Sequence, residues 1–138
     1  MRLLFIAFFS MFIFSAAYGD SFSPLDKSQM QQAIDGQLQA FKADDGARAY
    51  SYAAPLISQI FPSVDQFMTM VKRGYTPVYS NQKYSFGQLS TDANGRPAQH
   101  VLITGTDGKT YDAVYFMELE ADGSWKIAGC SLAELPNV

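Results

Sequence analysis

The spacing of apolar residues changes halfway along the chain, and this change constrains the fold more than any other feature. Between Met30 and Phe41, apolar side chains recur at steps of four, four and three, which is the spacing of one face of an α-helix. From about Val101 onward they alternate along three runs, which is the period of a β-strand. Helices followed by strands indicate an α+β domain, with N-terminal helices packed on one face of a curved antiparallel sheet.

Capping and breaking residues divide the helical half of the chain. Ser23 and Pro24 are suited to begin the first helix, because serine caps free backbone N–H groups and proline fits the first turn. Residues 44–46, which read Asp-Asp-Gly, break this helix and can cap the next one, expected over residues 47–54. Pro55 is expected to end or kink that second helix.

Two further helical segments are expected before the strands. Residues 56–61 are largely apolar and predict a turn or a short helix. Ser63 and Gln66 predict a reciprocal capping box at the start of a longer helix. Gly74 is expected just past the end of that helix, where a left-handed backbone favours glycine.

The second half contains the turn signals expected of an antiparallel meander. Asx-Gly pairs favour tight hairpin turns, and they occur at Asn94-Gly95, Asp107-Gly108 and Asp122-Gly123. Residues 83–89 predict an edge strand before the first of these turns. Alternation groups the following side chains on one face of their strands: Val101, Ile103, Tyr111, Ala113, Tyr115, Met117, Leu119, Trp125 and Ile127.

Residues 1–19 have the organisation of a cleaved secretory signal. A single basic residue, Arg2, precedes an apolar run over residues 3–14. That run is shorter than the roughly 20 apolar residues that a membrane-spanning helix needs. The alternative is that residues 1–19 are not cleaved and anchor the protein in the membrane. The shortness of the apolar run argues against this alternative.

The expected cleavage site defines the mature chain. Ala17 and Gly19 have the small side chains that a signal peptidase requires, so we expect cleavage before Asp20, with cleavage after Ala17 as the second choice. Residues 20–138 then form one predicted domain. We expect this domain in the periplasm or secreted, with no stable membrane anchor.

Charge and metal-ligand counts exclude several classes of partner and cofactor. Loss of Arg2 with the leader takes the formal net charge from −3 to −4, which gives no electrostatic attraction to nucleic acid or to an anionic membrane. Cys130 and His100 are the only cysteine and histidine, so neither an intramolecular disulfide nor a Cys/His zinc site is expected. No glycine-rich nucleotide-binding motif occurs, and we predict no cofactor.

Four short segments carry a resemblance to a known family. They read QLQAF at 37–41, GYTPVY at 74–79, YDAVYFME at 111–118 and DGSWKIAGC at 122–130. In these segments the chain resembles an uncharacterised bacterial domain-of-unknown-function family, which is similar to the cystatin-like cone fold of the nuclear transport factor two superfamily. The resemblance covers nearly all of residues 28–133.

This resemblance implies a shape but not a reaction. It implies a curved sheet wrapped around helices, with a conical cavity between them. The superfamily includes isomerases, dehydratases, small-ligand carriers and non-catalytic scaffolds, so a shared fold does not assign an activity. The particular family has no catalytic residue that could be carried over to this chain.

Asp44 and Asp45 are the weak candidates for catalysis. In related cone-fold enzymes an aspartate acts as acid or base inside the cavity, where burial would raise its pKa. The simpler interpretation is that one of the two caps the following helix while the other faces water. We favour the cap, because a helix start requires only this residue type at this spacing.

His100 and Cys130 are reactive residue types for which structural roles are expected. His100 shares a strand face with Leu102 and is expected to point outward, and the sequence indicates no acidic partner for it. Cys130 has no neighbouring histidine or helix start that would lower its pKa, so we expect a buried, inert thiol first. The alternative is a disulfide between two chains, which an odd cysteine in an exported protein can form.

Aromatic residues are the candidates for the wall of a ligand pocket. Their ring faces supply apolar surface and their polar tips can orient a ligand. The small Ala113 leaves space between two tyrosines on the same strand face, which favours a cavity there. The predicted pocket residues are Tyr75, Tyr79, Tyr111, Ala113, Tyr115 and Trp125.

Three functional hypotheses remain open from the sequence. We favour non-catalytic binding of a small apolar ligand or a protein partner, because no set of convergent acid and base groups is evident. A lyase or isomerase that uses Asp44 or Asp45 is the first alternative. The second is a homodimeric scaffold that associates through the outer face of its sheet, where Leu102, Val114 and Phe116 would form an apolar patch.

Overall fold

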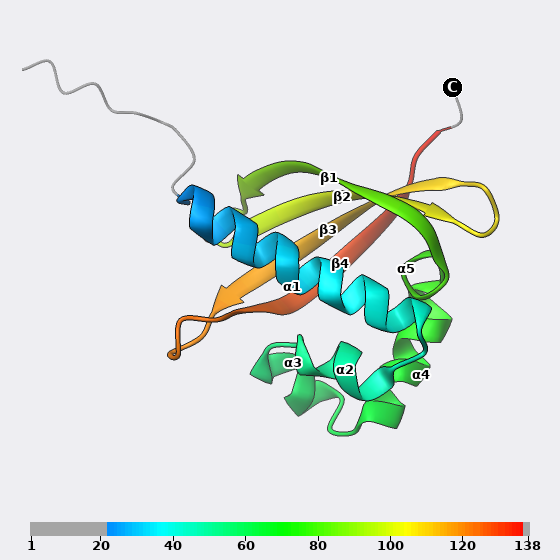
Figure 1. Ribbon diagram of the computed structural model, residues 1–138, viewed down its shortest axis with the longest axis horizontal. Coiled ribbons are helices and arrows are strands. Elements are labelled where there is room, and N and C mark those ends of the chain that lie inside the picture. Colours follow the sequence, from blue (N-terminus) through cyan, green and yellow to red (C-terminus); the bar gives the residue numbers. More distant parts are fainter. Residues whose placement is uncertain (1–21, 137–138) are drawn as a thin grey trace, which may run out of the picture.

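The computed structural model describes residues 22–136, and the predicted signal sequence lies outside them. Helices come first and strands follow, which confirms the α+β prediction (Figure 1). The elements are α1 (Pro24–Lys42), α2 (Gly46–Ser51), α3 (Pro55–Ile60), α4 (Val64–Gly74), α5 (Thr76–Tyr79), β1 (Asn81–Thr91), β2 (Pro97–Gly105), β3 (Thr110–Leu119) and β4 (Trp125–Glu134). The strands lie in the order β1-β2-β3-β4, and each neighbouring pair is antiparallel.

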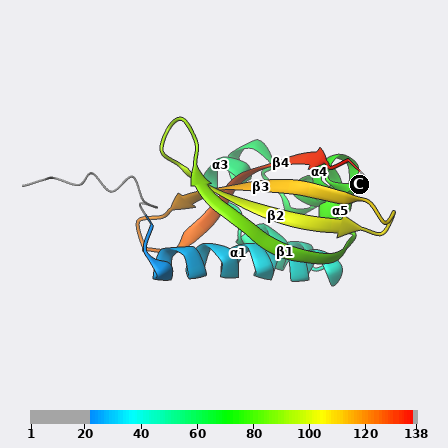
Figure 2. The same cartoon turned by 90° about the horizontal axis from the view of Figure 1, so that it is seen from above.

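The helices lie on one side of the sheet. The long helix α1 runs along this inner face, and it contacts both β1 and β4 (Figure 2). The shorter helices α2, α3 and α4 gather near the C-terminal half of α1 (Figure 1). The inner face of the sheet is therefore covered by one helix toward one end and by several helices toward the other.

The start and the apolar stripe of α1 follow from its sequence. Ser23 and Asp26 form a full capping box, in which each side chain accepts a hydrogen bond from the other's backbone N–H at 3.0 and 3.2 Å. Met30, Ile34 and Leu38 are fully buried, as the helical spacing predicts. The stripe thus places this face of α1 on the sheet.

Gly36 marks a close approach between α1 and the segment after α2. A Cβ atom at this position would overlap the hydroxyl of Tyr52. Glycine lowers helix stability by about 1 kcal/mol relative to alanine, and here its missing side chain leaves room for the Tyr52 ring. The helix bundle can therefore pack closely at this point.

The boundaries of the short helices correct several expectations. Pro55 is the first residue of α3 rather than the end of α2, because its fixed φ suits a first helical turn. Ser63 caps α4 by accepting from the N–H of Gln66 at 3.1 Å, but the glutamine side chain makes no reciprocal bond. Gly74 is the last residue of α4 and lacks the positive φ expected of it.

The three hairpin turns match their sequence signals. Gly95, Gly108 and Gly123 have φ values of +77°, +77° and +86°, which L-residues with side chains rarely adopt. In each of these turns an aspartate side chain accepts a hydrogen bond of 2.9 Å from the backbone N–H two residues later, and these aspartates are Asp92, Asp107 and Asp122. The turns therefore set the meander order of the strands.

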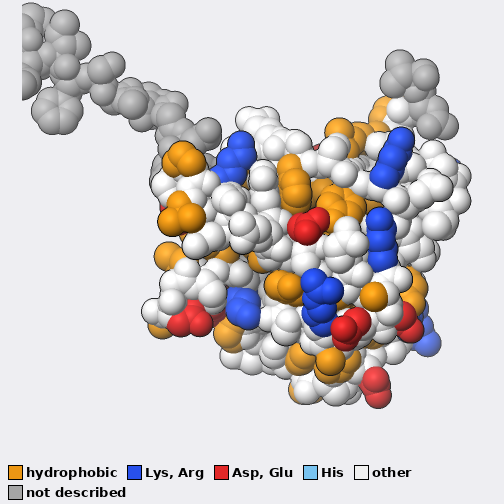
Figure 3. Space-filling view, in the orientation of Figure 1, with side chains coloured by type: hydrophobic (Ala, Val, Ile, Leu, Met, Phe, Trp, Pro, Cys, Tyr) orange, Lys and Arg blue, Asp and Glu red, His pale blue; other side chains and the backbone are white. Residues whose placement is uncertain are grey.

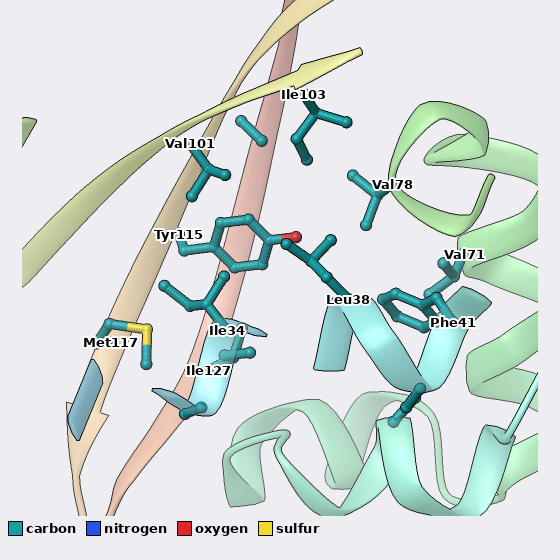
Figure 4. Close-up of a cluster of buried hydrophobic side chains, with 14 of the residues drawn as sticks. Ile34, Leu38, Phe41, Val71, Val78, Val101, Ile103, Tyr115, Met117 and Ile127 are labelled. Carbon is teal, nitrogen blue, oxygen red and sulfur yellow. The ribbon is translucent and has the colours of Figure 1, made fainter. Parts of the chain in front are cut away.

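The inner face of the sheet supplies half of the hydrophobic core. Figure 4 shows Val101, Ile103, Tyr115, Met117 and Ile127 directed toward the side chains of the helices, and all five are buried. Trp125, on the same face, is only 9% exposed, as its alternation with Ile127 predicts.

Leu119 does not belong to this core, although alternation groups it with Met117. It lies at the last position of β3 and is 54% exposed. The strand ends there, so its side chain lies beyond the part of the inner face that carries Ala113, Tyr115 and Met117.

Buried amides hold the edge strand in place. Gln99 is fully buried on β2, and its Nε2 donates to the carbonyls of Gly87 and His100 at 3.0 and 2.9 Å. Its Oε1 accepts from Gln31 of α1 at 3.2 Å. This side chain therefore satisfies backbone groups beside the irregularity in β1 between Phe86 and Leu89.

Candidate functional site

A cavity of about 310 Å³ lies where the cluster of short helices meets the inner face of the sheet. Its walls come from α1, α3, α4, α5, β3 and β4 and from the loops between them. The lining residues are Gln37, Phe41, Ala53, Ile57, Phe61, Phe67, Met70, Val71, Tyr75, Val78, Tyr115, Ile127, Gly129 and Cys130. None of these residues is a carboxylate, a lysine, an arginine or a histidine, so the cavity is largely apolar and carries no charge at neutral pH.

Aromatic rings of α1 and α4 meet at the cavity wall, and Tyr50 of α2 packs behind them. Phe41 and Phe67 stack with ring centroids 6.2 Å apart, and Tyr50 packs on Phe67 at 5.3 Å. The Tyr50 hydroxyl donates to the carbonyl of Phe61 at 2.7 Å, which ties α2 to the segment between α3 and α4. These contacts hold the helices around the cavity.

Tyr115 brings a polar atom to the cavity from the sheet. Its side chain leaves β3 with the hydroxyl directed toward the side of the core where Phe41, Val71 and Val78 lie (Figure 4). The residue is 1% exposed, and its buried hydroxyl has no hydrogen-bond partner within residues 22–136. Burial, together with the nearby Cys130 thiol, raises the pKa of Tyr115 well above its ordinary value, so the hydroxyl keeps its proton.

Tyr75 lines the cavity with its hydroxyl already engaged. This hydroxyl donates to the backbone carbonyl of Cys130 at 2.9 Å and so joins the end of α4 to β4. Burial is the main cause of the raised pKa of Tyr75, and Cys130 adds to it. Tyr75 therefore contributes ring surface and structural support rather than a free polar group.

Cys130 is a half-buried residue whose thiol lies at the cavity wall. Burial raises the pKa of this thiol to about 12, the nearby Tyr115 hydroxyl offsets part of the rise, and the negative charge of Asp112 adds to it. A thiol with such a pKa is protonated at neutral pH, which agrees with the inert role expected from the sequence.

Gln37 is a polar wall residue that the sequence interpretation missed. Its Nε2 donates to the carbonyl of Ala49 at 3.1 Å, and the side chain is buried between α1 and α2. It lies three residues after Ile34 and four before Phe41, so it belongs to the buried stripe of α1. A glutamine on an apolar stripe was the signal that could have identified it.

Helix α3 forms the least buried part of the cavity wall. Ile57 and Phe61 face the cavity and are half-buried, while Ile60 is 58% exposed. Backbone hydrogen bonds of 2.8 Å attach the preceding segment to the sheet, from Ala54 to Ile127 and from Ile127 to Tyr52. The helix is therefore anchored at its start while its own side chains cover the cavity loosely.

Two of the six predicted pocket residues, Tyr75 and Tyr115, line this cavity. Ala113 is fully buried on the same strand as Tyr115 but packs in the core and does not reach the cavity. Trp125 lies farther along β4, where its ring meets Phe22 edge-on at 6.1 Å. The alternation of apolar residues predicts which face of a strand a side chain lies on. Whether that side chain also lines the cavity depends on its position along the strand.

Tyr79 and Tyr111 do not line the cavity, and their hydroxyls form hydrogen bonds to aspartates at the surface instead. Tyr79 donates to Asp44 at 2.7 Å, and Tyr111 donates to Asp107 at 2.7 Å. The hydrogen bond to Asp107 is the main reason that the pKa of Tyr111 rises to about 12. Both rings therefore support loops at the edge of the fold.

Asp44 and Asp45 lie in the turn between α1 and α2, and neither is among the cavity residues. Asp45 caps α2, since its side chain accepts from the N–H of Arg48 at 3.1 Å. Asp44 is exposed and has a positive φ of 52°. The Tyr79 hydroxyl, with help from Lys72, lowers the pKa of Asp44, the opposite of what a cavity acid requires.

The outer face of the sheet carries a polar pair between its apolar side chains. His100 points outward as expected, and its Nδ1 lies 3.1 Å from both carboxylate oxygens of Asp112, a partner that the sequence did not indicate. Leu102 is 43% exposed, and the ring of Phe116 lies 5.6 Å from the guanidinium carbon of Arg96. The predicted patch is thus interrupted by charged groups.

No group of three or more His, Cys, Asp or Glu residues suited to a metal ion occurs within residues 22–136. Over the same range, the helices are too short or too polar to cross a membrane. The face that carries the helices shows its apolar side chains in separate patches among charged ones (Figure 3). The cavity is therefore the strongest candidate site in the described part of the chain.

Comparison with known proteins identifies a family but no described activity. No curated protein and no solved structure matches the chain. The family described as Domain of unknown function (DUF4864) matches residues 24–138, which include every element from α1 to β4. Because this match spans most of the sequence, the chain belongs to that family of domains of unknown function.

Proposed function

We propose that this domain binds one small, largely apolar molecule in the cavity between its helices and its sheet, and that it does so without catalysis. The observation that supports this most directly is an uncharged cavity of about 310 Å³ with a buried, unpartnered hydroxyl at its wall. Small-molecule sites are typically concave, mostly apolar hollows of about 300–1,000 Å³ with a few polar groups. This partly open hollow between the helices and the sheet has that size and that kind of wall, which favours an occupant.

The chemistry of the wall favours binding over the lyase or isomerase alternative. An acid–base reaction needs a titratable group beside the substrate, and the cavity residues include no carboxylate or histidine. Tyr115 and Cys130 at the wall both have raised pKa values, so both stay protonated at neutral pH and neither can readily accept a proton. Asp44 and Asp45 would have to leave their loop positions to take part.

The same proposal includes the cone-shaped fold of the nuclear transport factor two superfamily and export of the mature chain. A helical half that precedes an antiparallel meander, with a cavity between the two layers, supports the fold assignment. Export rests on the short apolar run and the small residues ahead of Asp20. An exported apolar-ligand carrier would meet its ligand outside the cytoplasm.

Binding of a protein partner or a second copy is a weaker proposal. Leu102 on the outer face is exposed, which favours a contact there. The His100–Asp112 pair and Arg96 lie among the apolar groups of that face, so a dry interface would bury charged side chains. The cavity presents no such cost to a neutral ligand.

Mass spectrometry of the mature chain tests the proposal. Protein purified under native conditions is weighed intact and then denatured, so that retained small molecules and oligomeric state are both recorded. We expect one small molecule per chain. Val71→Phe, which adds bulk at the cavity wall, should abolish retention, whereas Leu102→Phe on the outer face should leave it unchanged.

The variants are informative only if they remain folded. Overpacking a core site costs about 1–3 kcal/mol, so cooperative unfolding of Val71→Phe is checked first. Absence of any retained molecule in the wild-type protein, together with no binding of added neutral apolar compounds, would contradict the proposed function. A dimer without bound ligand would favour the scaffold alternative instead.

A further inference from the structure

The Tyr115 hydroxyl is the polar group in the core that no structural role explains. Three buried side-chain atoms lack a hydrogen-bond partner within residues 22–136: Asn81 Oδ1, the Tyr115 hydroxyl and Glu120 Oε1. Of these, only the Tyr115 hydroxyl belongs to a cavity-lining residue. A buried polar group without a partner destabilises the fold, and phenylalanine would fill the same space without that cost.

Other tyrosines of this fold show how a hydroxyl is normally satisfied. Tyr50 and Tyr75, both beside the cavity, donate to backbone carbonyls at 2.7 and 2.9 Å. Tyr79 and Tyr111 donate to carboxylates at the surface. Tyr115 differs from all four because its enclosed hydroxyl has no carbonyl or carboxylate acceptor. The polar group beside it is the thiol of Cys130, a weak acceptor, and the hydroxyl lies at the wall of a space large enough for a ligand.

The charge of the surroundings limits which ligand the hydroxyl can meet. The cavity lining contains no lysine, arginine or histidine that could neutralise an anion and no carboxylate that could neutralise a cation. An ion transferred into such a site without a partner is strongly disfavoured. A neutral hydrogen-bond acceptor needs no counter-charge, since the protonated hydroxyl itself is the donor.

The volume limits the size of the ligand. If each non-hydrogen atom occupies about the 30 Å³ that a water molecule takes in the liquid, then a cavity of about 310 Å³ holds about ten such atoms. The many aromatic and aliphatic side chains at the wall favour a hydrocarbon body for most of these atoms.

We propose that the cavity selects an uncharged molecule of about ten non-hydrogen atoms whose single carbonyl or ether-type oxygen accepts a hydrogen bond from the Tyr115 hydroxyl. This inference rests on the proposed function and specifies its ligand class. Tyr115 is the specificity-determining residue, because it is the lining residue that offers an unengaged donor enclosed in the core. The ring surfaces around it supply affinity without discriminating between polar and apolar ligands.

Three probes of equal size separate the possible ligand classes. Propiophenone carries one ketone oxygen, sec-butylbenzene carries none, and phenylacetate carries a negative charge; each has about ten non-hydrogen atoms around one phenyl ring. Their dissociation constants are measured by calorimetry on the mature chain at neutral pH. One hydrogen bond contributes about 0.5–1.5 kcal/mol, so we expect propiophenone to bind about 2- to 10-fold more tightly than sec-butylbenzene.

Tyr115→Phe tests whether this preference comes from the proposed hydrogen bond. In this variant the ketone oxygen is buried without a donor, so the ketone should bind more weakly than the hydrocarbon, while the hydrocarbon affinity stays close to that of wild type. Tyr79→Phe removes a hydroxyl outside the cavity and should keep the wild-type preference. The ¹³C resonance of the labelled ketone carbon should lie farther downfield when bound to wild type or to Tyr79→Phe than when bound to Tyr115→Phe, because only the first two retain the donor.

The outcomes distinguish failure of this inference from failure of the proposed function. Equal binding of ketone and hydrocarbon to wild type, a preference retained in Tyr115→Phe, or tighter binding of phenylacetate would overturn the inference while cavity binding stands. If none of the probes binds and no molecule is retained on purification, both the inference and the proposed function fail. The wild-type comparison keeps this test decisive even if Tyr115→Phe does not fold.

Discussion

The two ends of the helix–sheet interface are packed differently. At the packed end, which we define by Met30, Ile34, Met117 and Trp125, one long helix lies directly on the sheet and its side chains are buried. At the hollow end, defined by the cavity residues, short helices meet the same sheet and leave about 310 Å³ unfilled. Figure 4 shows Ile34 and Met117 on one side of Tyr115, with Phe41 and Val71 on the other.

The difference shows how one fold can separate stability from binding. The apolar side chains of a single amphipathic helix can pack closely between those of the sheet, because both surfaces are continuous. Short helices joined by tight turns cannot all approach the sheet equally, since each must also pack on its neighbours. The packed end is thus expected to carry most of the stability, and the hollow end to remain available for a ligand.

The largest expected effect is at the packed end. Trp125→Ala should lower the free energy of unfolding by about 3–5 kcal/mol, because it empties an aromatic core site and removes the contact with Phe22. Ile57→Ala, at the loosely covered wall of the cavity, should cost about 1 kcal/mol or less. Urea denaturation of both variants measures the contrast, and equal losses would mean that the two ends do not differ.

A smaller loss is expected when a satisfied buried amide is removed. Gln99 lies directly opposite Tyr115 on the neighbouring strand, and both are buried. Gln99→Leu leaves the carbonyls of Gly87 and His100 without their donor, so we expect a loss of about 2 kcal/mol. Hydrogen exchange should show faster opening of β1, whereas unchanged stability would indicate that these carbonyls have other partners.

The cap at the start of α2 tests the helical support of the hollow end. Asp45→Ala should cost about 1 kcal/mol, because the N–H of Arg48 loses its acceptor. Asp45→Asn should be nearly neutral, since asparagine caps equally well. Thermal unfolding of both variants provides the measurement, and a gain of stability in Asp45→Asn would instead indicate a carboxylate that is strained in the fold.

The smallest expected effect has the opposite sign. In the absence of ligand, Tyr115→Phe should raise the free energy of unfolding by about 0.5–1 kcal/mol, because it removes a buried hydroxyl that has no partner. Tyr75→Phe is the matched comparison at the same wall and should lower stability, since it breaks the bond to the Cys130 carbonyl. A loss of stability in Tyr115→Phe would show that its hydroxyl is satisfied in the ligand-free protein.

Much of the fold could be predicted because its signals are local. The steps between Met30 and Phe41 predicted the buried face of α1, and glycines at the three hairpins predicted turns that need a positive φ. The errors were at helix ends, such as Pro55 and Gly74, where neighbouring residues permit more than one boundary. Alternation also predicted the burial of Trp125, but it extended one residue too far at Leu119.

The candidate site was predicted less well than the fold. Tyr75 and Tyr115 were identified as pocket residues because aromatic side chains on core-facing positions favour such a role. Gln37 was missed, although its place on the apolar stripe of α1 marked it as buried and polar. The acidic partner of His100 could not be predicted, because it depends on the register between β2 and β3.

The sequence by itself determined the layers, the order of the strands and the core-facing side of α1 and of most of the strands, since periodicity and turn chemistry act over a few residues. Only the tertiary structure decided where the two layers separate and which hydroxyl remains without a partner. Those features depend on how the short helices pack against one another and on which backbone carbonyls come within reach of Tyr50, Tyr75 and Tyr115. Such distances are set jointly by segments far apart in the chain, and no local pattern encodes them.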